Sequence, residues 1–226
     1  MTPATTISAI DSTRLQAYLD ELARWNARMN LTAVGPERAW QRHVGETLTL
    51  LAAVSPNPGD RCIDVGSGGG VPGIPMAILR SDIEIVLLDA DRRKAGFLTH
   101  VCGLLRLTNA SAEALRAEDA GRDPAHRERY DLAVSRATAA APALCELCLP
   151  LVRVGGRFAA MLRSATEAAL EARAAALACG GAEPTAEAEE VMVVAKHAPC
   201  DDRYPRRPGV PARRPITGRI RGQVRK

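Results

Sequence analysis

The stretch RCIDVGSGGGVPGIP, residues 61–75, decides how the fold of this chain is interpreted. A short apolar segment, 62–65, leads into a loop with glycine at positions 66, 68, 69, 70 and 73. Glycine tolerates positive φ and lets the backbone approach a bound molecule closely. The stretch therefore predicts a buried strand, a ligand-binding loop and the start of a helix.

The segments around this stretch alternate between short apolar runs and helical patterns. The apolar runs predict strands at 61–65, 83–89, 110–112, 130–135, 157–162 and 190–197. The helices expected between or after them span 73–80, 91–105, 114–120, 138–149 and 165–179. This alternation is typical of an α/β fold with a mostly parallel sheet and helices on both faces.

The same patterns divide the chain into three parts. Residues 1–57 are expected to form a helical N-terminal extension, with helices over 11–29 and 36–54. Residues 58–200 are expected to form the α/β core, and residues 201–226 a basic C-terminal arm.

The arm dominates the charge of the chain. The net charge is +4, but nine Lys and Arg residues lie from Arg203 onward without any acidic residue, and residues 1–202 carry a net charge of −5. Prolines and a shortage of apolar residues predict an extended arm that buries little surface. Such a cluster is suited to neutralise the phosphates of a nucleic acid, with a solubilising tail as the alternative.

Composition narrows the class of protein further. Hydrophobic residues make up 46% and charged residues 25% of the 226-residue chain, as in ordinary globular proteins. No apolar run is long enough to cross a membrane, and the N-terminus lacks the pattern of a secretory signal. The six cysteines lie mostly in apolar segments, which predicts reduced core thiols in a cytoplasmic protein. Cys145 and Cys148 form a single CxxC pair, so no metal site is expected.

Two phosphate-binding interpretations of the glycine loop fit poorly. A P-loop needs Gly-Lys-Ser/Thr, and this loop has no lysine. The spacing Gly68-x-Gly70-x-x-Gly73 matches a dinucleotide fingerprint by count, but Pro72 and Pro75 remove N–H groups that a phosphate needs. The acidic residue at the end of the preceding strand would also repel a pyrophosphate.

S-adenosylmethionine fits the loop better, because it has no phosphate and carries an ammonium and a sulfonium. We expect the carboxylate of Asp64 to favour these positive charges, and Asp89, at the end of the next strand, to accept hydrogen bonds from the ribose hydroxyls. The loop residues expected to contact the ligand are Gly66, Gly68, Gly70 and Val71. A tight turn without a ligand is the structural alternative.

Several motifs resemble the bacterial small-subunit rRNA guanine-N7 methyltransferases, also called the glucose-inhibited division protein B family. The resemblance covers nearly the whole chain. It is carried by WNARMNLTAV (25–34), RHVGETL (42–48), DVGSGGGVPGIP (64–75), LLDADRRKAGFL (87–98), RAED (116–119), VSRA (134–137) and RYPRRPGVPARRPI (203–216).

The resemblance implies a Rossmann-like S-adenosylmethionine-dependent methyltransferase fold. It implies transfer of the methyl group to N7 of one guanine in the decoding region of 16S rRNA. It also implies that Gly66 and Val71 contact the donor, that Ala117 and Glu118 lie on either side of its adenine, and that Arg136 lies where donor and acceptor meet.

Two positions depart from the family pattern. The family usually reads His-x-x-Asp-Ser-Leu where this chain has HVGETL, residues 43–48. The family usually has Lys-Gly after the fifth strand, where this chain has Leu162 and Arg163. Either Arg163 replaces that lysine from a shifted position, or the contact is absent.

The chemistry of guanine N7 limits the roles that side chains need to fill. Its in-plane lone pair attacks without deprotonation, so no general base is required and the enzyme mainly aligns the reactants. Arg136 is therefore expected to position a phosphate, the guanine O6 or the donor's carboxylate, or else to pair with an acid such as Glu118. Trp25 is expected to pack between the N-terminal helices, and His43 to contact RNA or support helix packing. Besides the arm, the arginines expected to contact RNA are Arg24, Arg28, Arg38 and Arg42.

Two classes of alternative function remain. One is a methyltransferase that acts on another rRNA position or on a small molecule, and the basic arm argues against the small molecule. The other is a non-catalytic RNA-binding ribosome-assembly factor with a vestigial donor site, against which the intact motif residues argue. We expect a monomer that acts on 16S rRNA or the small ribosomal subunit, without a membrane or a metal.

Overall fold

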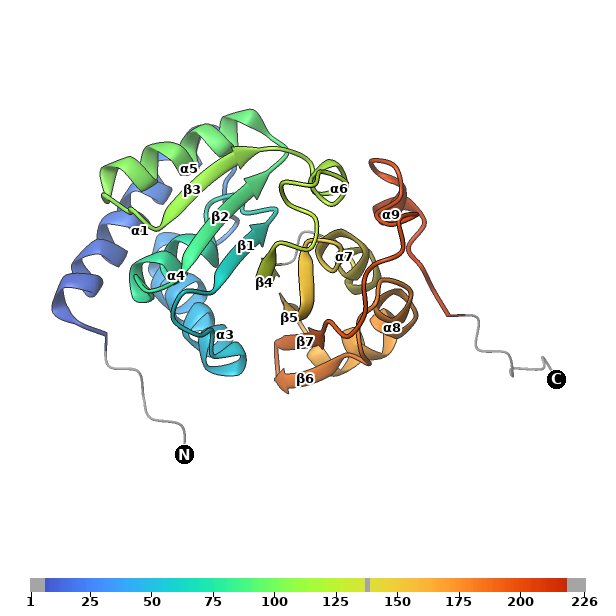
Figure 1. The fold of residues 1–226 in the computed structure, drawn as a ribbon. Helices are drawn as coiled ribbons and strands as arrows, with labels where there is room; N and C mark the ends of the chain where they lie inside the picture. The colour runs from blue at the N-terminus through green and yellow to red at the C-terminus, as the bar shows by residue number, and fades with distance from the viewer. Residues whose placement is uncertain (1–6, 137–138, 219–226) are drawn as a thin grey trace.

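The computed structural model describes residues 7–136 and 139–218, and its centre is one seven-stranded sheet (Figure 1). The strands are β1 (Arg61–Val65), β2 (Glu84–Asp89), β3 (Ala110–Ala114), β4 (Tyr130–Arg136), β5 (Val152–Met161), β6 (Thr185–Ala188) and β7 (Val191–Ala195). Their order is β3-β2-β1-β4-β5-β7-β6. Strands β1 to β5 are parallel, whereas β7 runs antiparallel to β5 and β6 antiparallel to β7. The predicted Rossmann-like α/β class is confirmed.

Helices cover both faces of this sheet. They are α1 (Ala9–Met29), α2 (Pro36–Ala39), the π-helix η1 (Trp40–Gly45), α3 (Glu46–Val54), α4 (Gly73–Leu79), α5 (Arg92–Leu104), α6 (Ala117–Ala120), α7 (Ala141–Cys148), α8 (Ala165–Ala178) and α9 (Val210–Arg213). Helices α3, α4 and α5 lie on one face, with α1 packed against α4 and α5, and α7 and α8 lie on the other face (Figure 1).

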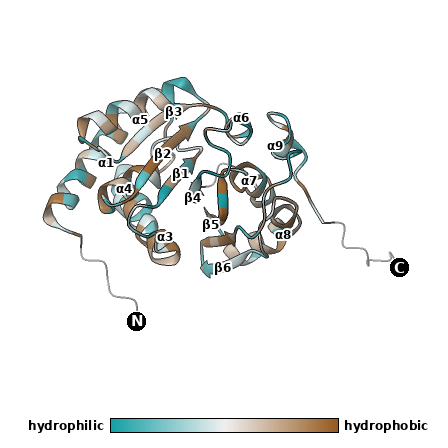
Figure 2. Cartoon of the chain, viewed as in Figure 1, coloured by the Kyte–Doolittle hydropathy of each residue, from teal (hydrophilic) through white to brown (hydrophobic). Residues whose placement is uncertain are grey.

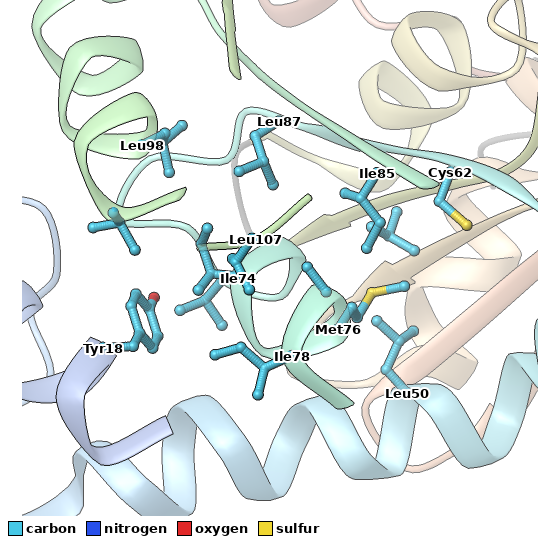
Figure 3. Packing of buried hydrophobic residues seen from close by; sticks show 14 of the residues in the cluster. Tyr18, Leu50, Cys62, Ile74, Met76, Ile78, Ile85, Leu87, Leu98 and Leu107 are labelled. Carbon is cyan, nitrogen blue, oxygen red and sulfur yellow. The ribbon is translucent and has the colours of Figure 1, made fainter. Parts of the chain in front are cut away.

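The alternation of side chains along β1 divides the core in two. Cys62 joins the cluster beneath α1, α3, α4 and α5, while Ile63 joins the cluster beneath α7 and α8. Figure 3 shows the first cluster, in which Ile74 and Met76 of α4 lie close to side chains of β2. In the hydropathy colouring of Figure 2, brown segments lie on strands such as β2 and on helices that cover the sheet, such as α4.

The N-terminal helices share this core with the sheet. Tyr18 and Leu22 of α1 and Leu50 of α3 are buried in the same cluster as Cys62. Trp25 packs against Phe97 of α5, with ring centroids 5.6 Å apart. Trp25 was predicted to pack between the N-terminal helices. Its aromatic partner is instead on α5, because α1 lies along α5.

The sequence pattern differs from the structure in four of the described elements. The helix expected over 36–54 is interrupted by the π-helical segment η1. Strand β5 begins at Val152 instead of residue 157, and strand β6 was not expected, because its burial pattern carries no apolar run. The helix expected to start at 138 starts at Ala141, and residue 138 lies outside the described residues.

The expectation of an arm that buries little surface is wrong for residues 203–218. Pro205 and Pro211 are buried, and Tyr204 and Ile216 pack against the cluster beneath α7 and α8. The short helix α9 lies beside α7. The sequence could not indicate this, because the surface that receives the arm comes from distant elements. Residues 219–226 lie outside the described part.

Candidate functional site

The C-terminal ends of β1, β2 and β4 border a cavity of about 500 Å³. This is the end of a parallel sheet at which α/β proteins bind ligands. We call this space the donor cavity. The predicted site residues that line it are Gly66, Gly68, Val71, Asp89, Ala117, Glu118 and Arg136. Asp64 and Gly70, which were also predicted, are not among the lining residues.

The glycine loop has the backbone that its sequence predicts. Gly66, Gly68 and Gly70 have φ values of 76°, 55° and 92°, a region that other residues rarely adopt. Tyr18 of α1 holds the loop from behind, because its hydroxyl donates a hydrogen bond to the Gly69 carbonyl at 2.7 Å. Tyr18 therefore supports the shape of the donor cavity, although it does not line the cavity itself.

The two predicted carboxylates have different places. Asp89 lines the cavity, and its Oδ2 accepts a hydrogen bond from the Gly68 N–H at 2.8 Å while Oδ1 accepts one from the Asp91 N–H. A carboxylate oxygen can accept a second bond, so Asp89 can still hold ribose hydroxyls. Asp64 is fully buried and accepts from the Gly73 N–H, so it supports the loop from inside. Burial raises the pKa of Asp64 to about 7, which makes it a poor fixed anion for a cationic ligand.

The C-terminal arm completes the far wall of the cavity. Glu118 is buried, and its Oε1 accepts hydrogen bonds from the Gly209 N–H at 2.7 Å and from Arg116 at 3.0 Å. Ala212 of α9 lies on the cavity itself. A residue far along the chain therefore lines the same cavity as Ala117, beside which the resemblance puts the adenine of the donor.

Arg136 is held by the segment that contains the π-helix. Its Nη1 donates to the Arg42 carbonyl at 3.0 Å, to His43 Nδ1 at 3.0 Å, and lies 3.4 Å from Glu46 Oε2. In an α-helix the Glu46 N–H would bond to the Arg42 carbonyl. In η1 it bonds to the Gln41 carbonyl instead, which leaves the Arg42 carbonyl for Arg136. The acid beside Arg136 is therefore Glu46, and the predicted pairing with Glu118 is wrong.

Burial controls the protonation of this cluster. His43 is fully buried, and desolvation, followed by the positive charge of Arg136, lowers its pKa to about 4. A neutral His43 has one ring nitrogen that accepts, which the Arg136 hydrogen bond requires of Nδ1. Burial raises the pKa of Glu46 against the opposing effects of Arg42 and Arg136. The structure thus places His43 in packing that supports Arg136, rather than on the surface.

A second cavity of about 500 Å³ adjoins the donor cavity, and we call it the acceptor cavity. Arg136 and Leu31 line both spaces. The remaining lining residues are Thr32, Ala33, Val34, Arg42, Glu46, Met161, Leu162, Arg163 and Glu190. Arg163, exposed after β5, lines this cavity, and whether it replaces the family's lysine stays a prediction.

Comparison with known proteins matches residues 11–196 to the model of rRNA small subunit methyltransferase G. Two relatives called ribosomal RNA small subunit methyltransferase G are 40% identical in Roseiflexus castenholzii and 41% identical in Symbiobacterium thermophilum. Each alignment covers 88% of this chain, with 89% and 87% of the relative. The chain belongs to the rRNA small subunit methyltransferase G family. It is an S-adenosylmethionine-dependent rRNA methyltransferase of the small ribosomal subunit, as the resemblance implied.

A solved structure supports the fold independently of this family. The S-adenosylmethionine-dependent O-methyltransferase from Thermotoga maritima superposes with a TM-score of 0.54 at 14% identity, over 80% of this chain and 72% of that one. At this identity the likeness shows the fold alone. As a member of the family, the chain uses S-adenosylmethionine as the methyl donor.

Sequence reasoning missed several residues of the two cavities. Lys94, in the first turn of α5, lines the donor cavity, and its place five residues after Asp89 is a signal that could have found it. Ala212 and Glu190 reach the cavities only through tertiary structure. Within 7–136 and 139–218, no group of three His, Cys, Asp or Glu side chains could hold a metal, and no helix is long and apolar enough to cross a membrane.

Proposed function

We propose that the chain transfers a methyl group from S-adenosylmethionine to N7 of a guanine in the decoding region of 16S rRNA. The supporting observation is that Arg136 lines both the donor cavity and the acceptor cavity, so a methyl group can pass between two bound reactants at this residue. The family places the reaction on small-subunit rRNA.

The donor cavity fits S-adenosylmethionine by its own residues. The open backbone at Gly66 and Gly68 accommodates the amino-acid part, Asp89 accepts the ribose hydroxyls, and Ala117 borders the adenine. When bound, this cosubstrate supplies an electrophilic methyl group on a sulfonium. Lys94 also lies on the cavity and offers a positive charge to the cosubstrate's carboxylate.

The acceptor cavity has the size and polarity for one purine. Its apolar side chains, Leu31, Val34 and Met161, can cover the faces of a base, and charged side chains line the same cavity. The base has to leave its stack to enter, as in other enzymes that modify a base. N7 attacks without losing a proton, so the residues here align and stabilise, and none has to act as a base.

RNA binding involves the arm in two ways. The described part, 203–218, docks on the body and reaches the donor cavity through Ala212, whereas four basic residues lie beyond it in 219–226. We expect truncation after Gly218 to weaken RNA binding in a salt-dependent way and to leave donor affinity unchanged. Truncation after Asp202 is expected to weaken both. Equal affinity for S-adenosylmethionine in the two truncated chains would show that residues 203–218 do not contribute to the donor site.

Three further properties belong to the proposal. The six cysteines are all buried and free, and rRNA is made in the cytoplasm, which supports a cytoplasmic enzyme. A monomer is the expected oligomeric state. The extension 1–57, the core 58–200 and the arm 201–226 act together, since all three reach or support the donor cavity.

One experiment tests the reaction. Small subunits from cells that lack the protein are incubated with the purified chain and tritiated S-adenosylmethionine, and the labelled nucleotide is mapped by mass spectrometry. We expect 7-methylguanine at one position of 16S rRNA. Label on another atom or position would favour the first alternative, and donor binding without any label would favour a non-catalytic assembly factor.

A further inference from the structure

We propose that Arg136 selects guanine by donating a hydrogen bond to O6 of the acceptor base, and that η1 holds Arg136 in the orientation this needs. The inference rests on the proposed function, because it takes the acceptor cavity as the place of the base, with N7 directed at the donor cavity. It adds to the proposed function the contact that distinguishes guanine from adenine in the acceptor cavity.

The contacts of Arg136 are concentrated on one nitrogen. The Arg42 carbonyl, His43 Nδ1 and Glu46 Oε2 all lie against Nη1. Among residues 7–136 and 139–218, neither Nη2 nor Nε of Arg136 makes a hydrogen bond or ion pair. A guanidinium has five N–H donors, so those on Nη2 and Nε remain available where the two cavities meet.

The chemistry of the base gives these donors a target. O6 is next to N7 on the same edge of guanine, and the common arginine contact to guanine engages both atoms. That two-point contact would occupy the N7 lone pair and prevent methylation. An arginine already fixed through Nη1 can instead offer one donor to O6 and leave N7 free. Adenine carries an amino group at this position, so its N–H would face the N–H of Arg136.

Charge balance explains why a carboxylate lies beside Arg136. Methylation gives the base a positive charge, which a lone guanidinium nearby would oppose. Glu46, whose side chain is only 12% exposed, lies 2.6 Å from Arg42 Nη1 and 3.4 Å from Arg136 Nη1. Its negative charge offsets that of Arg136 and favours the cationic product. Glu46 is thus a positioning residue that also balances charge.

The decisive test uses the wild-type enzyme and altered bases. Small-subunit rRNA is reconstituted with inosine or 2-aminopurine at the mapped target position. Inosine keeps O6 and N7 and lacks the 2-amino group, whereas 2-aminopurine keeps N7 and the 2-amino group and lacks O6. We expect inosine to be methylated nearly as well as guanine, and 2-aminopurine to lose about 10- to 100-fold in kcat/KM, the range for one hydrogen bond from a charged donor. The opposite order would overturn the inference.

Three variants complete the test. Arg136→Lys is expected to reduce the preference for inosine over 2-aminopurine, and Glu46→Gln to lower kcat more than Glu46→Asp, which keeps the charge. Donor affinity, measured by calorimetry, is expected to stay within a few fold in both Glu46 variants, whereas Arg136→Lys is expected to lower it as well, because Arg136 lines the donor cavity. If Arg136→Lys lowers donor affinity as much as kcat/KM and leaves the base preference intact, Arg136 serves the donor and the inference is wrong. If wild-type enzyme gives no 7-methylguanine on unmodified rRNA, the proposed function fails instead.

Discussion

The ion pair that docks the C-terminal arm offers a sharp test of how this chain stabilises its donor site. Glu146 of α7 is fully buried, and its oxygens accept from Arg206 Nε at 2.8 Å, from Arg206 Nη2 at 2.6 Å and from the Arg206 backbone N–H at 2.8 Å. The Arg206 side chain is 30% exposed. Removing Arg206 and removing Glu146 should therefore change the free energy of unfolding by different amounts.

We expect Arg206→Ala to cost more stability than Glu146→Ala. The first variant leaves a buried carboxylate with only one backbone N–H, a situation that costs about 3–5 kcal/mol. The second leaves a guanidinium that already reaches water, so about 2 kcal/mol is expected from the lost charged hydrogen bonds. The double variant Glu146→Leu with Arg206→Met should cost less than Arg206→Ala, because it buries no unpaired charge.

Urea unfolding of the three variants measures these differences, and Arg173→Ala is the matched control. Arg173 pairs with Glu183 on the surface, where both side chains are more than half exposed, so its loss should not move the unfolding midpoint. In Arg206→Ala the arm can also undock and rehydrate Glu146, which limits the loss of stability. Undocking would then appear as faster tryptic cleavage of the arm and weaker donor binding. Unchanged stability together with unchanged cleavage and donor affinity would refute the role given to this pair.

Three further predictions concern the donor loop and the residues that hold Arg136. Tyr18→Phe removes the hydroxyl that donates a hydrogen bond to the buried Gly69 carbonyl, so it should lower the free energy of unfolding in urea by about 1–3 kcal/mol. Calorimetry should also show weaker binding of S-adenosylmethionine. Unaltered affinity for S-adenosylmethionine would show that the loop keeps its shape without Tyr18. Gly66→Asp should abolish donor binding, because Gly66 has φ 76° and a new carboxylate would enter the cavity; retained binding would contradict the cavity assignment. His43 has a folded-state pKa of about 4, below its ordinary 6.5, so the unfolded chain takes up this proton more readily and the free energy of unfolding should fall as pH drops from about 6.5 toward 4. The contribution is about 3 kcal/mol at most, and it is measured as the difference between wild type and His43→Gln across that range; parallel curves would show that His43 does not titrate there.

The order of elements in the core could be predicted from local patterns. β1 was predicted with its observed bounds, and the glycine loop that follows it was recognised, because a short apolar run and a cluster of glycines each reflect the local backbone. Strand β6 could not be found in the same way. Its residues are mostly exposed, and it forms by pairing with β7.

Local sequence patterns predicted only part of the site. Asp89 was assigned to the donor site from its position at a strand end, and it lines the cavity. Asp64 has the same type of position, yet its side chain turns inward to the Gly73 N–H. Which way a side chain at a strand end points depends on the elements packed around it, and a sequence motif does not contain that information.

The sequence by itself determined the mostly parallel α/β sheet, the glycine loop and the family, because each depends on residues close together in the chain. Only the tertiary structure decided what holds Arg136 and where the arm lies. Arg136 and His43 are 93 positions apart, and Arg206 and Glu146 are 60 apart. Such contacts arise when packed elements bring polar and charged groups together, and the need to hydrogen-bond the buried members away from water then selects the partner.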